Sequence, residues 1–129
     1  MPGLVEFATY FGMGLGFMAL YVVLYMYATP HREITLIRGD NLPAAVVLAG
    51  AVLGFALPLS SALRVADSVA IIAAWAFIAL VAQLVAYALV ALLLKDFPKR
   101  INRGEMAAAV LAAAIHVSVG LLNSAAMNY

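Results

Sequence analysis

The sequence predicts an all-α integral membrane protein, a single polytopic domain over residues 1–129 with four transmembrane helices. Two observations carry this prediction. The chain is 67% hydrophobic and only 10% charged, whereas soluble domains are roughly half apolar and a quarter charged. A chain this short could not bury so much apolar surface in water. The charged residues also fall in clusters, and the gaps between the clusters have the length of membrane spans.

Four apolar runs are the predicted spans, and they cover about residues 4–29, 42–63, 68–94 and 106–127. Each run can cross a hydrocarbon core of about 30 Å, which takes roughly 20 helical residues. Helices are required because backbone polar groups in hydrocarbon must be satisfied within their own segment. No Lys or Arg precedes the first run, and the run is longer than a typical signal-peptide core, so we expect it to be a retained helix.

Start and stop signals support these boundaries. Thr29 and Pro30 close the first run, because proline cannot continue a helix. Asn41 followed by Pro43 has the pattern of a helix N-cap with proline in the first turn. Short polar loops are expected between the spans.

The basic residues predict the orientation. Six of the seven lie in two loops, namely Arg32, Arg38, Lys95, Lys99, Arg100 and Arg103. The loop between the second and third spans holds only Arg64. The positive-inside rule therefore predicts that the two basic loops are cytoplasmic and that both termini lie outside. Tyr25, Tyr27 and Tyr129 are expected at the membrane interface, where tyrosine is enriched.

The second half of the chain resembles the first. Residues 40–49 align with residues 104–113, and each segment leads from a polar loop into an Ala-rich return helix. This favours two parallel two-helix repeats, about 1–63 and 68–129, related by an axis along the membrane normal because each repeat crosses twice. The alternative is that Ala-rich helices resemble one another through composition alone.

Several motifs together point to one family. They are Glu33-Ile34-Thr35-Leu36-Ile37-Arg38-Gly39-Asp40-Asn41, Ala44-Ala45, Leu53-Gly54-Phe55-Ala56-Leu57-Pro58-Leu59, Ala82-Gln83-Leu84 and Val119-Gly120-Leu121-Leu122-Asn123. With them the chain resembles the YjfL-like family of bacterial inner-membrane proteins, the domain-of-unknown-function family numbered 350. The resemblance covers nearly the whole chain and implies a four-span protein of the bacterial inner membrane with a duplicated unit. It implies no activity. Asp40 stands where the family usually has glycine, and Ala126 stands where a cysteine is common.

Three polar side chains inside the spans are candidate functional residues, because polar groups in a membrane are costly. Gln83 and His116 lie near the middle of the third and fourth spans. These spans are consecutive and antiparallel, so both side chains fall at about the same depth and could hydrogen-bond. Asn123 shares a helix face with His116 by its i, i+7 spacing. The group either lines a polar path or simply holds helices together, a contact worth about 0.6 kcal/mol in membranes.

Small residues mark predicted helix contacts, because they let helix backbones approach closely. The positions are Gly12, Gly16, Gly50, Gly54 and Gly120. The contacts are expected either within one protomer or between protomers.

The predicted cytoplasmic loops hold a second set of candidates. These are Glu33, Arg38, Asn41, Lys99, Arg100 and Arg103. They could serve topology and contact with anionic headgroups, or they could dock a cytoplasmic protein partner.

Several function classes are disfavoured by what the sequence lacks. The chain has no cysteine and no histidine cluster with metal-ligand spacing, so no metal or cofactor is expected. No nucleophile has a base at a recognisable offset, and no carboxylate pair lies in a span, so we do not expect an enzyme. The few basic residues form no face suited to a phosphate backbone, so nucleic acid is not an expected partner.

Two functions remain as hypotheses. The first is a small ion or small-solute channel or permease in the lipid bilayer, with Gln83, His116 and Asn123 along the path. Four thin helices leave little room for an internal pore, so this hypothesis expects a homo-oligomer. The second is a non-transporting membrane scaffold whose basic loops recruit a stress or envelope partner.

Overall fold

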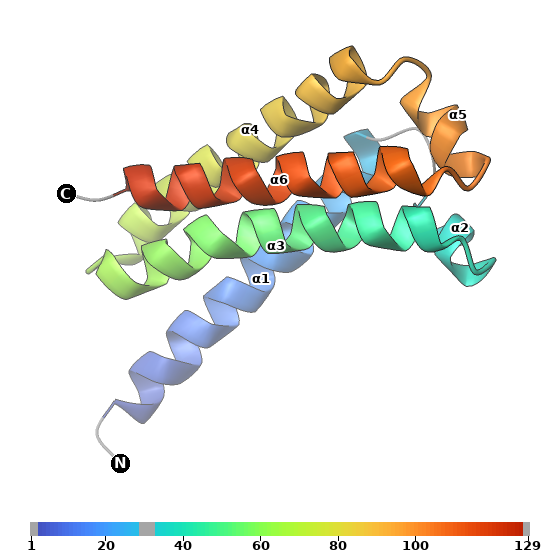
Figure 1. Cartoon of the computed structure of the whole chain (residues 1–129). Coiled ribbons are helices and arrows are strands. Elements are labelled where there is room, and N and C mark those ends of the chain that lie inside the picture. Colours follow the sequence, from blue (N-terminus) through green and yellow to red (C-terminus); the bar gives the residue numbers. More distant parts are fainter. Residues whose placement is uncertain (1–2, 29–32, 128–129) are drawn as a thin grey trace.

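The computed structural model describes residues 3–28 and 33–127, and within them the regular secondary structure is all α-helix, joined by short turns. Four long helices, α1 (Leu4–Ala28), α3 (Leu42–Val65), α4 (Val69–Leu93) and α6 (Met106–Ala126), coincide with the four predicted spans to within two residues at each described end (Figure 1). Each is long and apolar enough to cross a membrane. The predicted all-α membrane architecture is therefore confirmed.

Two short helices replace the loops that the sequence predicts at one end of the bundle. They are α2 (Glu33–Arg38) and α5 (Phe97–Asn102). After each, the chain turns into the next long helix through a residue with positive φ, Asp40 at 65° and Gly104 at 81°. Glycine adopts this conformation freely and aspartate tolerates it. Neither short helix was predicted, because six residues are too few to show a clear periodicity.

The predicted helix start at Asn41 is present. Its side-chain oxygen accepts a hydrogen bond from the backbone N–H of Ala44 at 2.9 Å, and Pro43 occupies the first turn of α3. The Asn41 side-chain nitrogen donates to the carbonyl oxygen of Ile101 at 3.0 Å. One side chain therefore caps α3 and ties it to α5, the short helix of the other connection.

Helices α3 and α6 run side by side and in the same direction at the centre of the bundle (Figure 1). Their backbones touch at glycine. A Cβ on Gly50 would lie 2.5 Å from the Cα of Ala113, and a Cβ on Gly120 would lie 2.1 Å from the carbonyl oxygen of Gly54. Close approach of this kind is how small residues hold helices together in lipid. At these glycines the two backbones leave no room between them for a solute.

The other two long helices differ in how much they bury. Helix α4 packs on both α3 and α6 and buries a stripe of six residues, Ile72, Ala76, Ala79, Gln83, Ala86 and Val90. Helix α1 buries only Tyr21 and Tyr25, and its N-terminal half diverges from the bundle (Figure 1). The apolar side chains exposed along α1, such as Phe7 and Phe11, are suited to contact with lipid.

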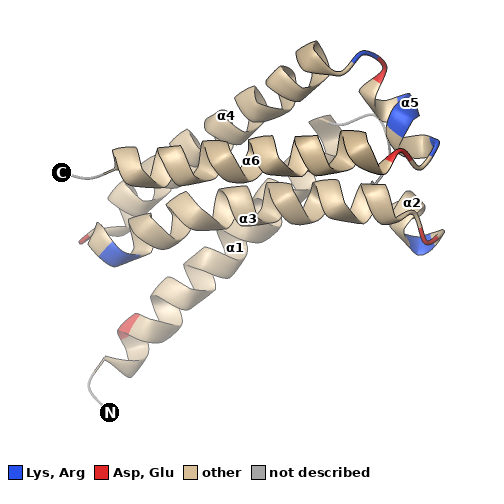
Figure 2. Ribbon diagram, in the orientation of Figure 1, with Lys and Arg blue, Asp and Glu red and all other residues tan. Residues whose placement is uncertain are grey.

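The core consists of two apolar clusters. One, at the end of α2 and α5, contains Ala44, Val47, Val90, Phe97, Ile101, Ala108, Ala109 and Ala112. The other, further along α3, contains Tyr21, Tyr25, Ala51, Phe55, Leu59, Ala76 and Ala79. Charged residues gather at the ends of the molecule, with the basic residues of α2, α5 and their turns at one end and Arg64 at the other (Figure 2).

Candidate functional site

A polar pair lies buried where the four long helices meet. Gln83 of α4 and His116 of α6 are both 0% exposed. The Gln83 side-chain nitrogen donates to the backbone carbonyl oxygen of His116 at 3.2 Å, and Gln83 Oε1 lies 2.8 Å from His116 Nδ1. The Tyr25 ring of α1 meets the imidazole edge to face at 5.6 Å between centroids. The predicted contact between Gln83 and His116 is therefore present, at the predicted depth.

Gly54 of α3 completes the site by leaving room for it. A Cβ at this position would lie 2.3 Å from the carbonyl oxygen of His116 and 2.9 Å from the side-chain nitrogen of Gln83. Any side chain at position 54 would therefore press on the hydrogen bond itself. Each of the four long helices contributes one residue to the pair or to its immediate surroundings.

Two buried nitrogen atoms near the site have no hydrogen-bond partner among the described residues. They are Nε2 of His116 and the side-chain nitrogen of Asn123. Buried polar groups are nearly always bonded to protein or to water, so each unpaired group calls for an explanation. Asn123 follows His116 by two turns along α6, but the buried residues of this helix include His116 and Gly120 and not Asn123. It makes no hydrogen bond to the Gln83–His116 pair.

A second polar group links α3 to α6 at the end remote from α2 and α5. The hydroxyl groups of Ser61 and Ser124 share a hydrogen bond, and Arg64 donates to Ser61 at 3.3 Å. These residues line an open pocket of about 420 Å³ together with Val65, Ala125 and Met127. The pocket gives the α3–α6 seam a polar mouth at this end.

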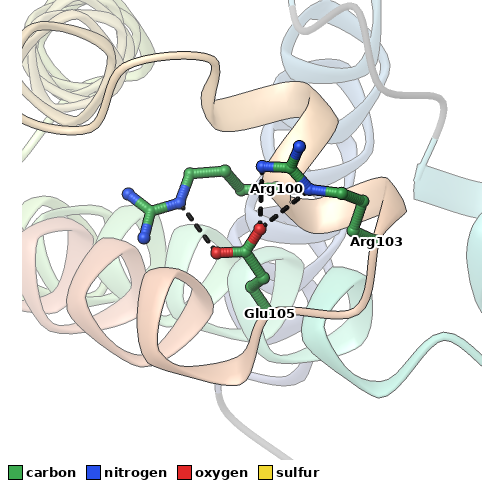
Figure 3. Close-up of polar contacts among 3 residues, drawn as sticks. All are labelled: Arg100, Arg103 and Glu105. Atoms are coloured by element: carbon green, nitrogen blue, oxygen red, sulfur yellow. Dashed lines mark hydrogen bonds and ion pairs between the residues drawn. The ribbon is translucent and has the colours of Figure 1, made fainter.

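The opposite end carries an ion-pair cluster on Glu105. One carboxylate oxygen lies 3.0 Å from Arg100 Nε, and the other lies 2.9 Å from Arg103 (Figure 3). The hydrogen bond from Arg100 is the main cause that lowers the pKa of Glu105 below its ordinary value. Both arginines were predicted candidates, but Glu105 was not predicted to be their shared partner. The available signal was the position of Glu105 directly after the Gly104 turn that follows them.

The remaining loop candidates are not drawn together. Arg38 and Lys99 are exposed, and Asn41 bonds to Ile101 as described above. The Glu33 side chain and Arg32 lie outside the described part of the structure. Within the described part, no group of three His, Cys, Asp or Glu residues could hold a metal ion.

The glycine candidates divide into two sets. Gly50, Gly54 and Gly120 make close helix contacts within the chain. Gly12 and Gly16 do not, since a Cβ on either would meet nothing within 4 Å. Gly14 faces α3 instead, where a Cβ would lie 3.1 Å from the Leu63 side chain.

One aromatic expectation was wrong. Tyr25 was expected at the membrane interface, but it is 0% exposed and packs against His116. Position along the span suggested an interfacial tyrosine. The burial follows from the rotation of α1, which turns Tyr21 and Tyr25 toward the other helices.

These features define a class, an all-helical protein with four helices able to span a membrane and a buried polar pair between them. The family model described as "Domain of Unknown Function (DUF350)" matches residues 1–127. The chain belongs to this family. It is 33% identical over 129 residues to the UPF0719 inner membrane protein YjfL of Escherichia coli K12, covering all of this chain and 98% of that protein. The protein of the same name from Escherichia coli O157:H7 gives the same identity and coverage. No solved structure matches the chain.

Proposed function

We propose that this chain is the subunit of a small permease or channel for an ion or small solute, with its path through the Gln83–His116 pair. The supporting observation is the fully buried His116, whose Nε2 has no partner among the described residues. An ionisable residue at this depth is costly and is a functional candidate by default. Because buried polar atoms nearly always have a hydrogen-bond partner, the open Nε2 is a place where a ligand could bind.

The path is proposed on the α1 side of His116. The seam between α3 and α6 is closed by backbone contact at Gly54 and Gly120. Helix α1 buries only two residues and covers His116 with the Tyr25 ring. Helix α1 buries the fewest residues of the four long helices, so its movement would expose the imidazole with the least loss of buried surface. The apolar cluster at the α2–α5 end, which includes Phe97 and Ile101, blocks further passage in this conformation.

The proposal includes the finer architecture. The two halves are proposed as parallel repeats, supported by the shared order of a long, a short and a long helix and by the matched turns at Asp40 and Gly104. The orientation follows the positive-inside rule, with the α2–α5 end cytoplasmic and both termini outside. A homo-oligomer is proposed because the closed α3–α6 seam leaves the single chain without a pore. No catalytic activity is assigned.

Flux through proteoliposomes tests this function. The parent is expected to conduct, and His116→Ala and Asn123→Ala are expected to lose flux. Ser118→Ala is the matched control, because Ser118 is a polar residue of α6 that is exposed rather than buried. Equal flux in the parent and in empty vesicles, from correctly inserted protein, would contradict the proposal.

The scaffold remains the second candidate, favoured by one observation. The predicted cytoplasmic end is held by specific contacts. Glu105 forms ion pairs with two arginines, and Asn41 at the start of α3 donates a hydrogen bond to α5. Such a surface could present Arg38 and Lys99 to a stress or envelope partner. Under this hypothesis the double variant Arg38→Glu, Lys99→Glu abolishes function in cells, whereas His116→Ala preserves it. The permease hypothesis expects the reverse.

A further inference from the structure

We propose that Gln83 positions His116 in the tautomer that carries hydrogen on Nδ1, so that the unpaired Nε2 takes only a ligand that donates a hydrogen bond. This inference rests on the proposed function, because it names the class of solute that the same site accepts. It makes Gln83 a positioning residue and makes the lone pair of Nε2 the specificity-determining feature of the path.

The tautomer follows from the two hydrogen bonds of the pair. The backbone carbonyl of His116 can only accept, so the Gln83 atom 3.2 Å away is the amide nitrogen, which donates. The other terminal atom of Gln83 is then its carbonyl oxygen, which can only accept. That oxygen lies 2.8 Å from His116 Nδ1, so Nδ1 carries the hydrogen. A flipped amide would set two acceptors against each other at the backbone carbonyl.

The free nitrogen therefore has a defined chemistry. A neutral imidazole has one N–H group, and here it is used by Gln83, so Nε2 keeps its lone pair. Three groups contact the pair: the Tyr25 ring from α1 meets the imidazole, Gln83 from α4 bonds to Nδ1, and the backbone at Gly54 from α3 lies against the His116 carbonyl. None of them is a cationic group that could hold an anion. Helices α4 and α6 carry no charged side chain along their whole length.

A neighbouring pocket fits the same class. This apolar pocket of about 160 Å³ lies between α1, α3 and α4, and its lining includes Phe17, Tyr21, Phe55 and Phe77. Tyr21 stacks on Phe55 at 4.4 Å and lies 5.8 Å from the Tyr25 ring that covers His116. The faces of aromatic rings attract N–H groups and cations and repel anions. The aromatic surface of this pocket therefore suits the same class of solute, one with an N–H or O–H group.

Nitrogen-15 NMR of the full chain in lipid bilayers tests the tautomer directly. The histidines are labelled, and the signals that disappear in His116→Gln are assigned to His116. The expected parent spectrum shows Nδ1 protonated and Nε2 unprotonated. Gln83→Leu removes the acceptor for the Nδ1 hydrogen and is expected to lose this preference. A parent with hydrogen on Nε2 overturns the proposal whether or not any variant folds.

The ligand class is tested with the same labelled protein. Methylammonium and ammonium, as donors, are expected to shift the Nε2 resonance, and nitrate and formate are expected not to. A shift with the anions alone refutes the donor assignment, and no shift with either class argues against a ligand at this nitrogen. Flux is measured separately. If the protein shows no flux but carries hydrogen on Nδ1, the permease proposal is contradicted and the positioning role of Gln83 is not. If the protein shows flux but carries hydrogen on Nε2, only the positioning role is contradicted.

Discussion

Replacing Gly54 with alanine tests the central packing of the bundle. The added Cβ would lie 2.3 Å from the carbonyl oxygen of His116, about 1.1 Å inside the 3.4 Å at which ordinary contact begins. The atoms it meets include the backbone of α6, so no side-chain rotation relieves the overlap. Helices α3 and α6 must separate by about this distance, and a gap of 0.5–1 Å forfeits roughly a quarter to a half of each contact's dispersion energy.

We expect Gly54→Ala to lower the free energy of unfolding by about 1–3 kcal/mol, the usual cost of overpacking a well-packed core. The assay is reversible unfolding in mixed detergent micelles. Gly12→Ala is the matched control, because a Cβ there meets nothing within 4 Å. If Gly54→Ala were as stable as Gly12→Ala, the reasoning that places α3 against α6 at backbone contact would be refuted.

Three further predictions concern the ends of the molecule. The chain has no native cysteine, so a single introduced cysteine reports the side of the membrane on which it lies. Asp67→Cys should react with an impermeant maleimide on intact cells, and Lys99→Cys should react only after permeabilisation. The opposite pattern would reverse the proposed orientation. Because the pKa of Glu105 is lowered, its ion pairs stabilise the fold at neutral pH and are lost as the pH falls through that pKa. Glu105→Gln should therefore make the free energy of unfolding depend less on pH in the acidic range. Asn41→Ala removes a helix cap and should cost about 1 kcal/mol, while alanine at the exposed Asn102 should leave the unfolding curve unchanged.

The depth of the polar pair followed from sequence because it depends on simple geometry. Consecutive spans run antiparallel, so residues equally far from their connecting loop lie at the same level, and Gln83 and His116 satisfy this condition. The rotation of each helix was harder to predict. All four spans are apolar around most of their circumference, so hydrophobic periodicity does not mark the face that turns inward. The inward rotation that buries Tyr25 is therefore seen only in the structure.

The sequence by itself determined the number, bounds and helical nature of the spans and the cap at Asn41, because hydropathy, length and capping are local properties. Only the tertiary structure decided which small residues pack together. Gly50 and Gly54 have the same spacing as Gly12 and Gly16, yet only the first pair contacts another helix of the chain. The tertiary structure also decided that Glu105 gathers the two arginines. Both outcomes depend on how helices distant in sequence approach one another, which a local pattern does not encode.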